Sequence, residues 1–351
     1  MSARKLNKRQ KSQAQKNQSK RLSHASRNER DLTRQTQSGE LSSPQKGLVI
    51  CRYSKEFEVE ALEGENKGAL HRCVSRTNIG NIVAGDKVTW RAGTKLSGVI
   101  ESRMDRESVL ERPDNFGNLK EVAANLNQMV IVIACQPSPQ TNLIDRYIVA
   151  AELMRIKAVL VLNKADLIDN SNQDELDALL KRYHRLGYKT AKIVSSRHQT
   201  PQLRELTELI DRKTSIVVGQ SGVGKSSLIN ALLPDANLQV GDLSHSSGEG
   251  THTTTQAKLF HLPKGGQLID SPGIRDFSLW HIDISELVLG YREIHQLAQQ
   301  CKFRNCQHKN EPACAVLNGI ETGEIEQIRF DSFTATREAI EQQQDRFNTN
   351  L

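Results

Sequence analysis

Residues 215–233 read SIVVGQSGVGKSSLINALL, and this stretch decides the fold around it. It begins with an apolar run typical of a buried strand and ends with a short helical pattern that stops at Pro234. Between the two, residues 219–226 match the phosphate-binding pattern G-x-x-x-x-G-K-S/T. The glycines let backbone N–H groups turn toward phosphate oxygens, and the start of the helix adds a partial positive charge. The stretch therefore predicts a phosphate site between a strand and a helix.

The residues of this loop have expected parts in holding a nucleotide. Lys225 is expected to reach the β- and γ-phosphates, and the Ser226 hydroxyl to complete the coordination of Mg²⁺. The sequence therefore predicts that magnesium accompanies the nucleotide. The predicted nucleotide contacts in this stretch are Gly219, Gln220, Ser221, Gly222, Val223, Gly224, Lys225, Ser226 and Ser227.

A second motif indicates that the base is guanine. Asn163-Lys164-Ala165-Asp166 follows an apolar strand expected over residues 158–162. A carboxylate at Asp166 can accept both the N1–H and the N2–H of guanine, whereas adenine would leave it desolvated and unpaired. After the next strand, Ser195 and Ser196 are expected to offer backbone donors to the guanine O6. Taken alone, the motif at residues 163–166 could instead be a turn that ends in a helix cap.

Two further segments are predicted to respond to the γ-phosphate. Asp270-Ser271-Pro272-Gly273 follows a strand expected over residues 267–269, and here the Asp would hold magnesium through water while the Gly273 amide meets the γ-phosphate. Residues 248–255, GEGTHTTT, suit a switch loop in which one threonine ligates Mg²⁺ only when triphosphate is bound. We select Thr254 for this role, with Thr253 as the second candidate.

The catalytic group is predicted from an unusual residue. Ile274 stands where many GTPases keep a glutamine that orients the attacking water, and an isoleucine cannot do this. His252 is the nearest candidate to hold or deprotonate that water. The alternative is that His252 packs or contacts a partner. We therefore predict slow intrinsic GTP hydrolysis that rises when a partner fixes the loop.

The order of these motifs is unusual, because the guanine motif and the serine pair precede the phosphate loop. From about residue 127, apolar runs alternate with helical patterns, which predicts an α/β domain with a parallel sheet between helices. A chain with this fold can have its usual termini joined and new termini opened elsewhere, because chain termini lie at the surface. The cut falls just after the Asp270 motif, so we hypothesise that nucleotide state is coupled to the region that follows.

Three cysteines and one histidine gather within fourteen residues: Cys301, Cys306, His308 and Cys314. Zn²⁺ takes four such ligands tetrahedrally, and a Cys₃His set leaves no open position, so we predict one structural zinc ion per chain. The alternative is a set of reduced, unrelated cysteines. Four basic residues in or near the cluster would suit contact with an RNA backbone: Arg292, Lys302, Arg304 and Lys309.

The basic excess of the chain lies at its N-terminal end. Residues 1–46 hold 12 of the 48 Lys and Arg residues against three acidic ones, and they contain few large apolar groups. We predict a disordered basic tail that contacts RNA or DNA, with a purely solubilising tail as the alternative. No apolar run is long enough to span a bilayer, so we expect a cytoplasmic protein without a membrane partner.

Residues 47–111 show five short strand-like runs separated by turn residues. Five strands in this length suit a small closed β-barrel of the OB type, whose open face commonly takes oligonucleotides. A β domain used only for packing is the alternative. The remaining cysteines, Cys51, Cys73 and Cys135, are isolated in apolar stretches and are expected to be buried.

Taken together, the motifs, their order and the β-rich N-terminal region resemble the bacterial ribosome small-subunit-dependent GTPase A family, the RsgA/YjeQ family of circularly permuted GTPases. The resemblance implies an OB-fold, a permuted GTPase domain and a zinc-binding domain. It also implies action late in 30S subunit maturation, contact with 16S rRNA, and GTPase activity stimulated by the small subunit. The proposed catalytic histidine of the family falls on His252, and its zinc ligands fall on Cys301, Cys306, His308 and Cys314.

We expect a multidomain monomer with four segments. These are a basic tail (1–46), an OB-fold RNA-binding domain (47–112), a permuted P-loop GTPase domain (113–281) and a helical zinc-binding domain (282–351). The leading hypothesis is an enzyme that hydrolyses GTP to GDP and phosphate. The first alternative is a non-enzymatic RNA-binding clamp gated by guanine nucleotide, suggested by Ile274. The second, an ATP-using kinase or transporter component, is disfavoured by Asp166.

Overall fold

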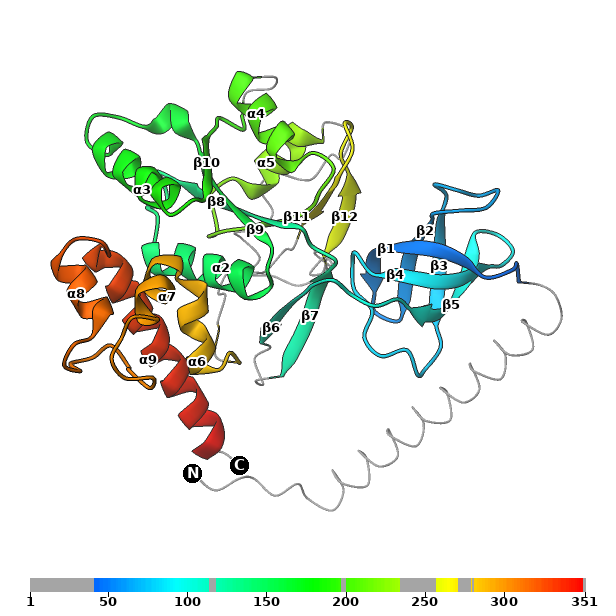
Figure 1. The fold of residues 1–351 in the computed structure, drawn as a ribbon. Helices are drawn as coiled ribbons and strands as arrows, with labels where there is room; N and C mark the ends of the chain where they lie inside the picture. Colours follow the sequence, from blue (N-terminus) through cyan, green and yellow to red (C-terminus); the bar gives the residue numbers. More distant parts are fainter. Residues whose placement is uncertain are drawn as a thin grey trace, which may run out of the picture. The chain divides into compact units, whose positions relative to one another are not determined.

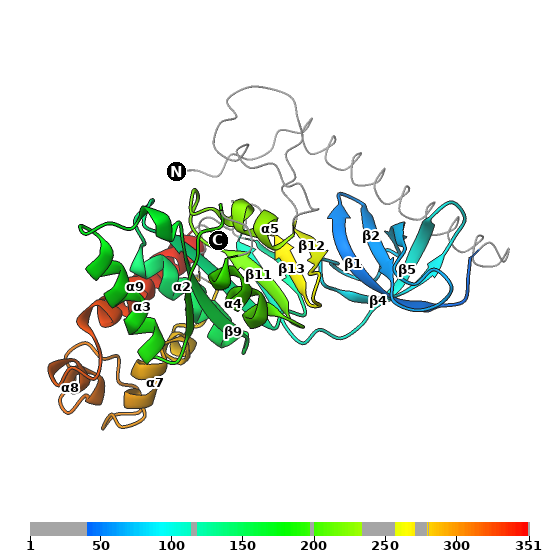
Figure 2. The ribbon, with the colours of Figure 1, turned by 90° about the horizontal axis from the view of Figure 1, so that it is seen from above.

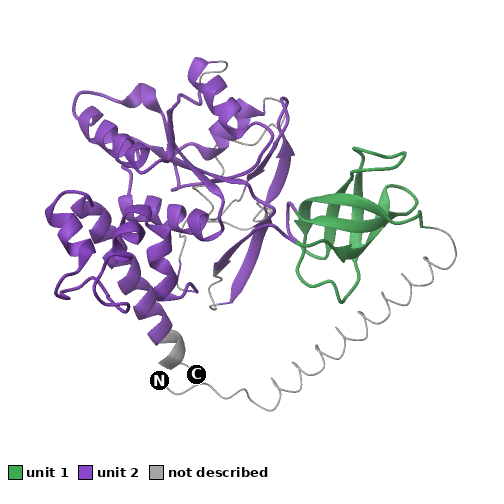
Figure 3. Ribbon diagram, viewed as in Figure 1, with its two compact units in different colours: residues 1–82, 86–105 green, residues 83–85, 106–351 purple. Residues whose placement is uncertain are grey.

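The computed structural model describes residues 41–113, 118–196, 200–233, 257–270, 279 and 281–349. These residues form two compact units (Figure 3). Unit 1 holds the described residues up to Ile82 together with Asp86–Asp105, and unit 2 holds Val83–Gly85 and the described residues from Arg106 onward. Among the described residues, no helix combines the length and apolar character needed to cross a membrane.

Unit 1 is a five-stranded closed barrel. Its strands are β1 (Gln45–Tyr53), β2 (Glu56–Ala61), β3 (Leu70–Ser75), β4 (Lys87–Ala92) and β5 (Ser97–Arg103). They lie in the order β1-β2-β3-β5-β4, and β4 pairs back onto β1 to close the sheet. Only the β3–β5 pairing is parallel. This closed arrangement confirms the barrel expected from the five short apolar runs.

The barrel interior is built around the indole of Trp90. This side chain is fully buried, and its Nε1–H donates to the carbonyl of Lys46 over 3.3 Å. A Cβ added at Gly47 or Gly98 would lie within 2.8 Å of the indole, so the two glycines leave room for the ring. Gln45 and Lys46, which the sequence assigned to the tail, are the first residues of β1, because they pair with β4 beside this ring.

Unit 2 contains a six-stranded sheet whose strands lie in the order β10-β9-β8-β11-β13-β12 (Figure 1). The strands are β8 (Gln128–Ala134), β9 (Lys157–Asn163), β10 (Lys189–Lys192), β11 (Thr214–Val218), β12 (Lys258–His261) and β13 (Gln267–Asp270). All neighbouring pairs are parallel except β12–β13. β8 is buried at every position, as expected for a central strand covered on both faces.

Helices cover both faces of this sheet. The helices are α2 (Thr141–Leu153), α3 (Gln173–Arg185), α4 (Pro201–Ile210) and α5 (Lys225–Leu232). Buried side chains of α4 and α5 pack with those of β8, β9 and β11 in one core cluster. On α2 and α3, Asp145 and Tyr183 are hydrogen-bonded to each other, which places these two helices side by side. The predicted α/β fold class is confirmed.

Two features of unit 2 differ from the sequence expectation. The strand expected directly before Ser195 is β10, which ends earlier, at Lys192. Only Ala191 is buried in it, because β10 is an edge strand whose solvent-facing positions are polar. The hairpin of β6 (Val109–Pro113) and β7 (Leu119–Ala124) was not predicted. The hairpin is joined to the start of unit 2 by a bridge between Ala84 and Ala123.

The C-terminal region is helical and lies in the same compact unit as the sheet. Its elements are α6 (Ile284–Leu287), the 3₁₀ turn η3 (Val288–Gly290), α7 (Arg292–Ala298), α8 (Ala315–Glu321) and α9 (Gln327–Thr349). α9 and η3 pack against α2, where a Cβ on Gly290 would lie 2.6 Å from Val149. The boundaries of the four segments expected from the sequence stay a prediction.

Candidate nucleotide site and metal cluster

The phosphate-binding loop lies between β11 and α5 and depends on two glycines. Gly219 has a φ of 142°, and a Cβ there would lie 2.2 Å from the carbonyl oxygen of Val132. Gly224 has a φ of 91°, and a Cβ there would lie 2.3 Å from Nδ2 of Asn163. Any other residue type would be strained at these φ values and would displace the Val132 backbone or the Asn163 side chain. Gly224 is also the N-cap of α5 and brings no side-chain cap, so the first N–H groups of the helix remain available to an anion.

Lys225 lies across its own loop. Its ammonium donates to the carbonyl oxygens of Gly219 and Gln220, each over 2.8 Å. Asp270 ends the neighbouring strand, in register with Val217 of β11. Burial raises the pKa of Asp270, and the charge of Lys225 opposes that shift. A desolvated carboxylate beside a phosphate loop suits the compensating charge of a magnesium ion held through water.

Asn163 joins three segments of the site. The side chain is fully buried at the end of β9, and its Nδ2 donates to the carbonyl of Val223 over 2.9 Å. Its Oδ1 accepts from the backbone N–H of Ser195 over 3.1 Å. These bonds connect the guanine motif to the phosphate loop and to the serine pair. Asn163 therefore positions the site through protein contacts, and the nucleotide contact expected of this motif residue stays a prediction.

The other residues of the guanine motif lie at the surface. Lys164 has a φ of 58°, and its ammonium donates to the carbonyl of Gln136 over 2.9 Å. Asp166 is exposed in the 3₁₀ turn η1 (Ala165–Leu167). Within the described part of the chain, its carboxylate has no recorded hydrogen bond, so it is available to a ligand. Ser195 is buried and Ser196 is exposed.

These residues meet at one edge of the sheet because each follows the carboxyl end of a strand. The guanine motif follows β9, the serine pair follows β10, the phosphate loop follows β11, and Asp270 ends β13. Ligands of open α/β sheets bind at this edge. The structure thus brings the predicted residues of the described segments together. His252, Thr253, Thr254, Gly273 and Ile274 lie outside the described residues.

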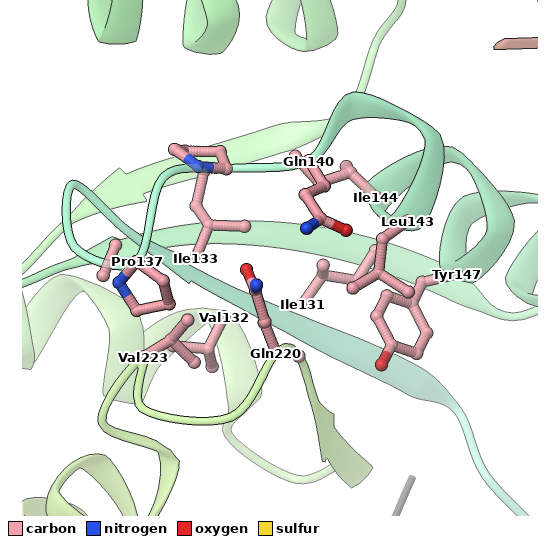
Figure 4. Close-up of a pocket in the computed structure, with 13 residues that line it drawn as sticks. Ile131, Val132, Ile133, Pro137, Gln140, Leu143, Ile144, Tyr147, Gln220 and Val223 are labelled. Carbon is pink, nitrogen blue, oxygen red and sulfur yellow. The ribbon is translucent and has the colours of Figure 1, made fainter. Parts of the chain in front are cut away.

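A small apolar pocket is lined in part by the phosphate loop (Figure 4). Its walls come from β8, from the loop that leads into α2, and from α2 itself. Figure 4 shows the amides of Gln140 and Gln220 facing each other across this pocket. The pocket is where the start of α2 approaches the phosphate loop.

The Cys₃His residues form a tight cluster between α7 and α8. Their ligand atoms all lie within 4.8 Å of one another. Sγ of Cys301 is 3.9 Å from Sγ of Cys314 and 3.7 Å from Nδ1 of His308, and the latter two atoms are 3.4 Å apart. For bonds of about 2.3 Å to sulfur, the edge of a tetrahedron is about 3.8 Å. The cluster could therefore hold a metal ion in the geometry that zinc prefers.

The protonation chemistry of the cluster also suits a cation. Burial lowers the pKa of His308, which favours the neutral imidazole that metals bind. Burial, together with the neighbouring cysteines, raises the pKa of the Cys306 thiol to about 12. Three thiolates this close repel one another, so a divalent ion is needed to keep them deprotonated together.

Comparison with known proteins identifies the family. The family model described as RsgA GTPase matches residues 103–280. A curated protein of Marinobacter nauticus is 49% identical over 99% of both chains, and one of Hahella chejuensis is 50% identical over 100% of both. Both bear the name Small ribosomal subunit biogenesis GTPase RsgA. The chain belongs to the RsgA GTPase family.

Solved structures of two similar proteins agree with the RsgA assignment. YjeQ from Thermotoga maritima is 30% identical with a TM-score of 0.69, over 85% of this chain and 98% of that chain. YloQ, described as a circularly permuted GTPase, is 28% identical with a TM-score of 0.66, over 86% of this chain and 96% of that chain. The predicted resemblance, the permuted fold and the enzyme class, a GTPase, are confirmed. The chain stands among the GTPases of small ribosomal subunit biogenesis.

Two features of this RsgA-family chain were missed by sequence reasoning. Glu311 accepts hydrogen bonds from the backbone N–H groups of Gln307, Lys309 and Asn310 over 2.8, 2.8 and 3.1 Å. These bonds fix the turn that carries His308 and lower the pKa of Glu311 to about 2. A carboxylate three residues after the histidine was the available signal.

The second feature is Arg292, which the sequence placed among the basic residues around the metal cluster. Its guanidinium instead pairs with Glu152 of α2 over 2.8 Å and lies over the ring of Tyr188. Arg292 therefore attaches α7 to the body of unit 2, and the exposed basic residues of the cluster loop are Lys302, Arg304 and Lys309.

Proposed function

We propose that this chain hydrolyses GTP while bound to the small ribosomal subunit, late in its maturation. The observation that carries the proposal is the meeting of the guanine motif, the phosphate loop and Asp270 at one edge of one sheet. The names of the RsgA relatives support the ribosomal partner.

Guanine recognition rests on Asp166. Its exposed carboxylate accepts from N1–H and N2–H of the base, and the backbone at Ser195 and Ser196 donates to O6. Asn163 acts indirectly, since its amide keeps the serine pair and the phosphate loop at a fixed separation. Lys164, held by the carbonyl of Gln136, lines the side of the base and sugar.

Phosphate binding rests on residues 219–227 and Asp270. Backbone N–H groups of the loop and the start of α5 surround the phosphate oxygens, and the Lys225 ammonium moves from the loop carbonyls to the β- and γ-phosphates. Ser226 and Thr254 would ligate magnesium directly and Asp270 through water. When bound, magnesium neutralises charge on the β- and γ-phosphates. Gly273 would donate its amide to the γ-phosphate.

Water activation is assigned to His252. Ile274 cannot orient the attacking water, so hydrolysis depends on a loop histidine brought into place by the small subunit. Intrinsic turnover is therefore slow, and docking raises it. This arrangement makes hydrolysis report on a correctly assembled partner.

The remaining parts of the chain serve binding and stability. The barrel of unit 1 and the basic residues 1–46 contact 16S rRNA. One structural zinc ion per chain is held by Cys301, Cys306, His308 and Cys314, because four protein ligands leave no open position for catalysis. The protein acts as a cytoplasmic monomer.

GTP turnover tests the proposal. Multiple-turnover hydrolysis is measured with the full chain alone and with isolated 30S subunits, with 50S subunits as the control. We expect hydrolysis to rise at least tenfold with 30S subunits only. Equal rates in all three mixtures would overturn the ribosomal part of the proposal, and equal use of ATP and GTP would overturn the assignment of Asp166.

A further inference from the structure

The loop that carries the metal cluster presents one aromatic ring to solvent. Residues 299–314 connect α7 to α8 at an outer end of unit 2, away from α5, in both ribbon views (Figures 1 and 2). Phe303 is 41% exposed on this loop. Apart from Phe303, the loop contains Pro312 and Ala313 as its other apolar residues outside the cysteines. An exposed phenyl ring on a polar loop has no part in the core.

The ring is surrounded by positive charge. Lys302, Arg304 and Lys309 are all exposed, and no ion pair is recorded for any of them within the described residues. The Lys302 ammonium lies 5.7 Å from the centre of the Phe303 ring. Glu311 is the only acidic residue of the loop, and its carboxylate is engaged by three backbone N–H groups. The surface is therefore basic around an aromatic centre.

Hydrogen bonds also fix the loop backbone that carries the ring. Phe303 lies between two ligands of the cluster, Cys301 and Cys306, and its carbonyl accepts from the N–H of Cys306 over 3.2 Å. Glu311 fixes the second half of the loop in the same way. A preorganised loop loses less conformational entropy on binding than a flexible one.

We propose that Phe303 is a stacking surface for an unpaired RNA base, and that Lys302, Arg304 and Lys309 neutralise the phosphates on either side of that base. The inference rests on the proposed function, because it names the part of the chain that reads single-stranded rRNA. Every base has a π-face, so such stacking is sequence-tolerant, and neighbouring cations follow the backbone. A protein partner would instead favour a wider apolar patch with few charges at its centre.

The experiment compares four versions of the zinc-loaded full chain: wild type, Phe303→Ala, Phe303→Leu and Phe303→Tyr. The probes are a ten-nucleotide uridine RNA, an abasic ribose-phosphate oligomer of the same length, and isolated 30S subunits. We expect Phe303→Ala and Phe303→Leu to weaken binding of the uridine RNA and 30S subunits roughly tenfold. Phe303→Tyr should bind as the wild type does, because it keeps the aromatic face. All four should bind the abasic oligomer equally.

Charge is tested separately with Lys302→Gln and Lys309→Gln. Each substitution should weaken binding of both oligomers. Each should also reduce the slope of log K against log salt concentration by about 0.7, the value for one phosphate contact on a single strand. Lys264→Gln, an exposed lysine of the β12–β13 turn, is the matched charge control. Leu289→Ala, 45% exposed on η3, is the matched apolar control.

Three results would overturn the inference. The first is that Phe303→Ala binds the uridine RNA as tightly as the wild type does. The second is that Phe303→Leu does so, which would indicate a general apolar contact. The third is that the variants lose affinity for the abasic oligomer as much as for the uridine RNA. Zinc content and the thermal midpoint of each variant confirm that the loop remains folded. Wild-type GTP hydrolysis with 30S subunits is measured alongside, so failure of the proposed function is seen independently of the Phe303 variants.

Discussion

Arg329 and Asp145 form an ion pair that is closed to solvent. Arg329 lies on α9 and is 1% exposed, and Asp145 lies on α2 and is 0% exposed. The Arg329 guanidinium also pairs with Glu293 of α7 over 2.6 Å, and the Tyr183 hydroxyl of α3 donates to Asp145 over 2.6 Å. One buried guanidinium thus joins the C-terminal helices to the two helices on one face of the sheet.

The pKa shifts show how burial and charge pairing oppose each other in this network. Burial raises the pKa of Asp145, and the Arg329 guanidinium and the Tyr183 hydroxyl oppose that shift. Burial alone would lower the pKa of Arg329, but Asp145 and Glu293 hold it above its ordinary value. Such a network contributes little net stability while intact, yet losing one member leaves a buried charge without compensation.

Arg329→Met should therefore be strongly destabilising. Two buried carboxylates lose their cation, and we expect the free energy of unfolding to fall by about 3–5 kcal/mol. Urea denaturation followed by fluorescence measures the change. Arg185→Met is the matched control, because this exposed residue pairs with Glu326 at the surface and should cost less than about 1 kcal/mol. Equal losses for both variants would contradict the distinction.

Asn163→Ala should weaken nucleotide binding without changing base preference. The amide is buried and hydrogen-bonded to the backbone at Val223 and Ser195, so its loss frees two segments of the site. We expect this to cost about 1–3 kcal/mol of nucleotide-binding free energy. We expect affinities for GTP and GDP to fall in parallel, as measured by fluorescent-nucleotide titration. A change in the ratio of guanine to adenine nucleotide affinity would mean that Asn163 contacts the base itself.

Asp166→Asn should change the base that is accepted. Xanthine carries a carbonyl at C2 in place of the guanine amino group, so an amide donor at residue 166 suits xanthine and a carboxylate suits guanine. We expect GTP hydrolysis to fall at least a hundredfold while hydrolysis of xanthosine triphosphate rises above the wild-type level. Asp169→Asn, another exposed aspartate a few residues along, is the control and should change neither rate. Unchanged GTP use by Asp166→Asn would remove the residue from base recognition.

Local patterns predicted much of the fold and site because they depend on neighbouring residues. Five short strands were expected within residues 47–111, where β1–β5 form the barrel, and short motifs predicted the phosphate loop, Asp166 and the metal ligands. The Arg329 network could not be predicted in this way. Its partners Asp145 and Glu293 are 184 and 36 residues away, and in the sequence Arg329 is one of many charged residues on a helix.

Edge elements were missed or misplaced for a related reason. β10, β12 and the β6–β7 hairpin are short or partly exposed, so their residues lack the apolar runs that identify central strands. Asn163 shows the limit for a site residue. The motif predicted where it lies, but only the distances to Val223 and Ser195 show that its amide bonds to protein.

Gly224→Ala should impair the phosphate loop more than backbone strain alone explains. A Cβ there would lie 2.3 Å from Nδ2 of Asn163, and the φ of 91° is unfavourable for alanine. We expect GTP affinity to fall at least tenfold in an equilibrium titration. Gly323→Ala is the control, because its φ is 79° and nothing lies within 4 Å of the added Cβ, so only strain of about 1–2 kcal/mol applies and nucleotide affinity should hold. Similar GTP affinities for the two variants would show that the contact with Asn163 is unimportant.

Glu311→Gln should weaken metal retention by the Cys₃His cluster. The glutamine keeps the shape of Glu311, but it has one neutral acceptor oxygen where the carboxylate has two charged ones. At least one of the three backbone N–H groups then faces an amide NH2, so the turn that carries His308 is held less firmly. We expect zinc to transfer to a chelating dye about tenfold faster, although all four metal ligands are unchanged.

The pKa of Glu311 is held at about 2, below its ordinary value, so the contribution of its charge is complete above about pH 4.5 and is lost only as the pH falls toward 2. The difference between wild type and variant should therefore be constant from pH 6 to 8. Glu321→Gln, an exposed glutamate at the end of α8, is the control, and a variant difference that changes across this pH range would contradict the assigned role of the Glu311 charge.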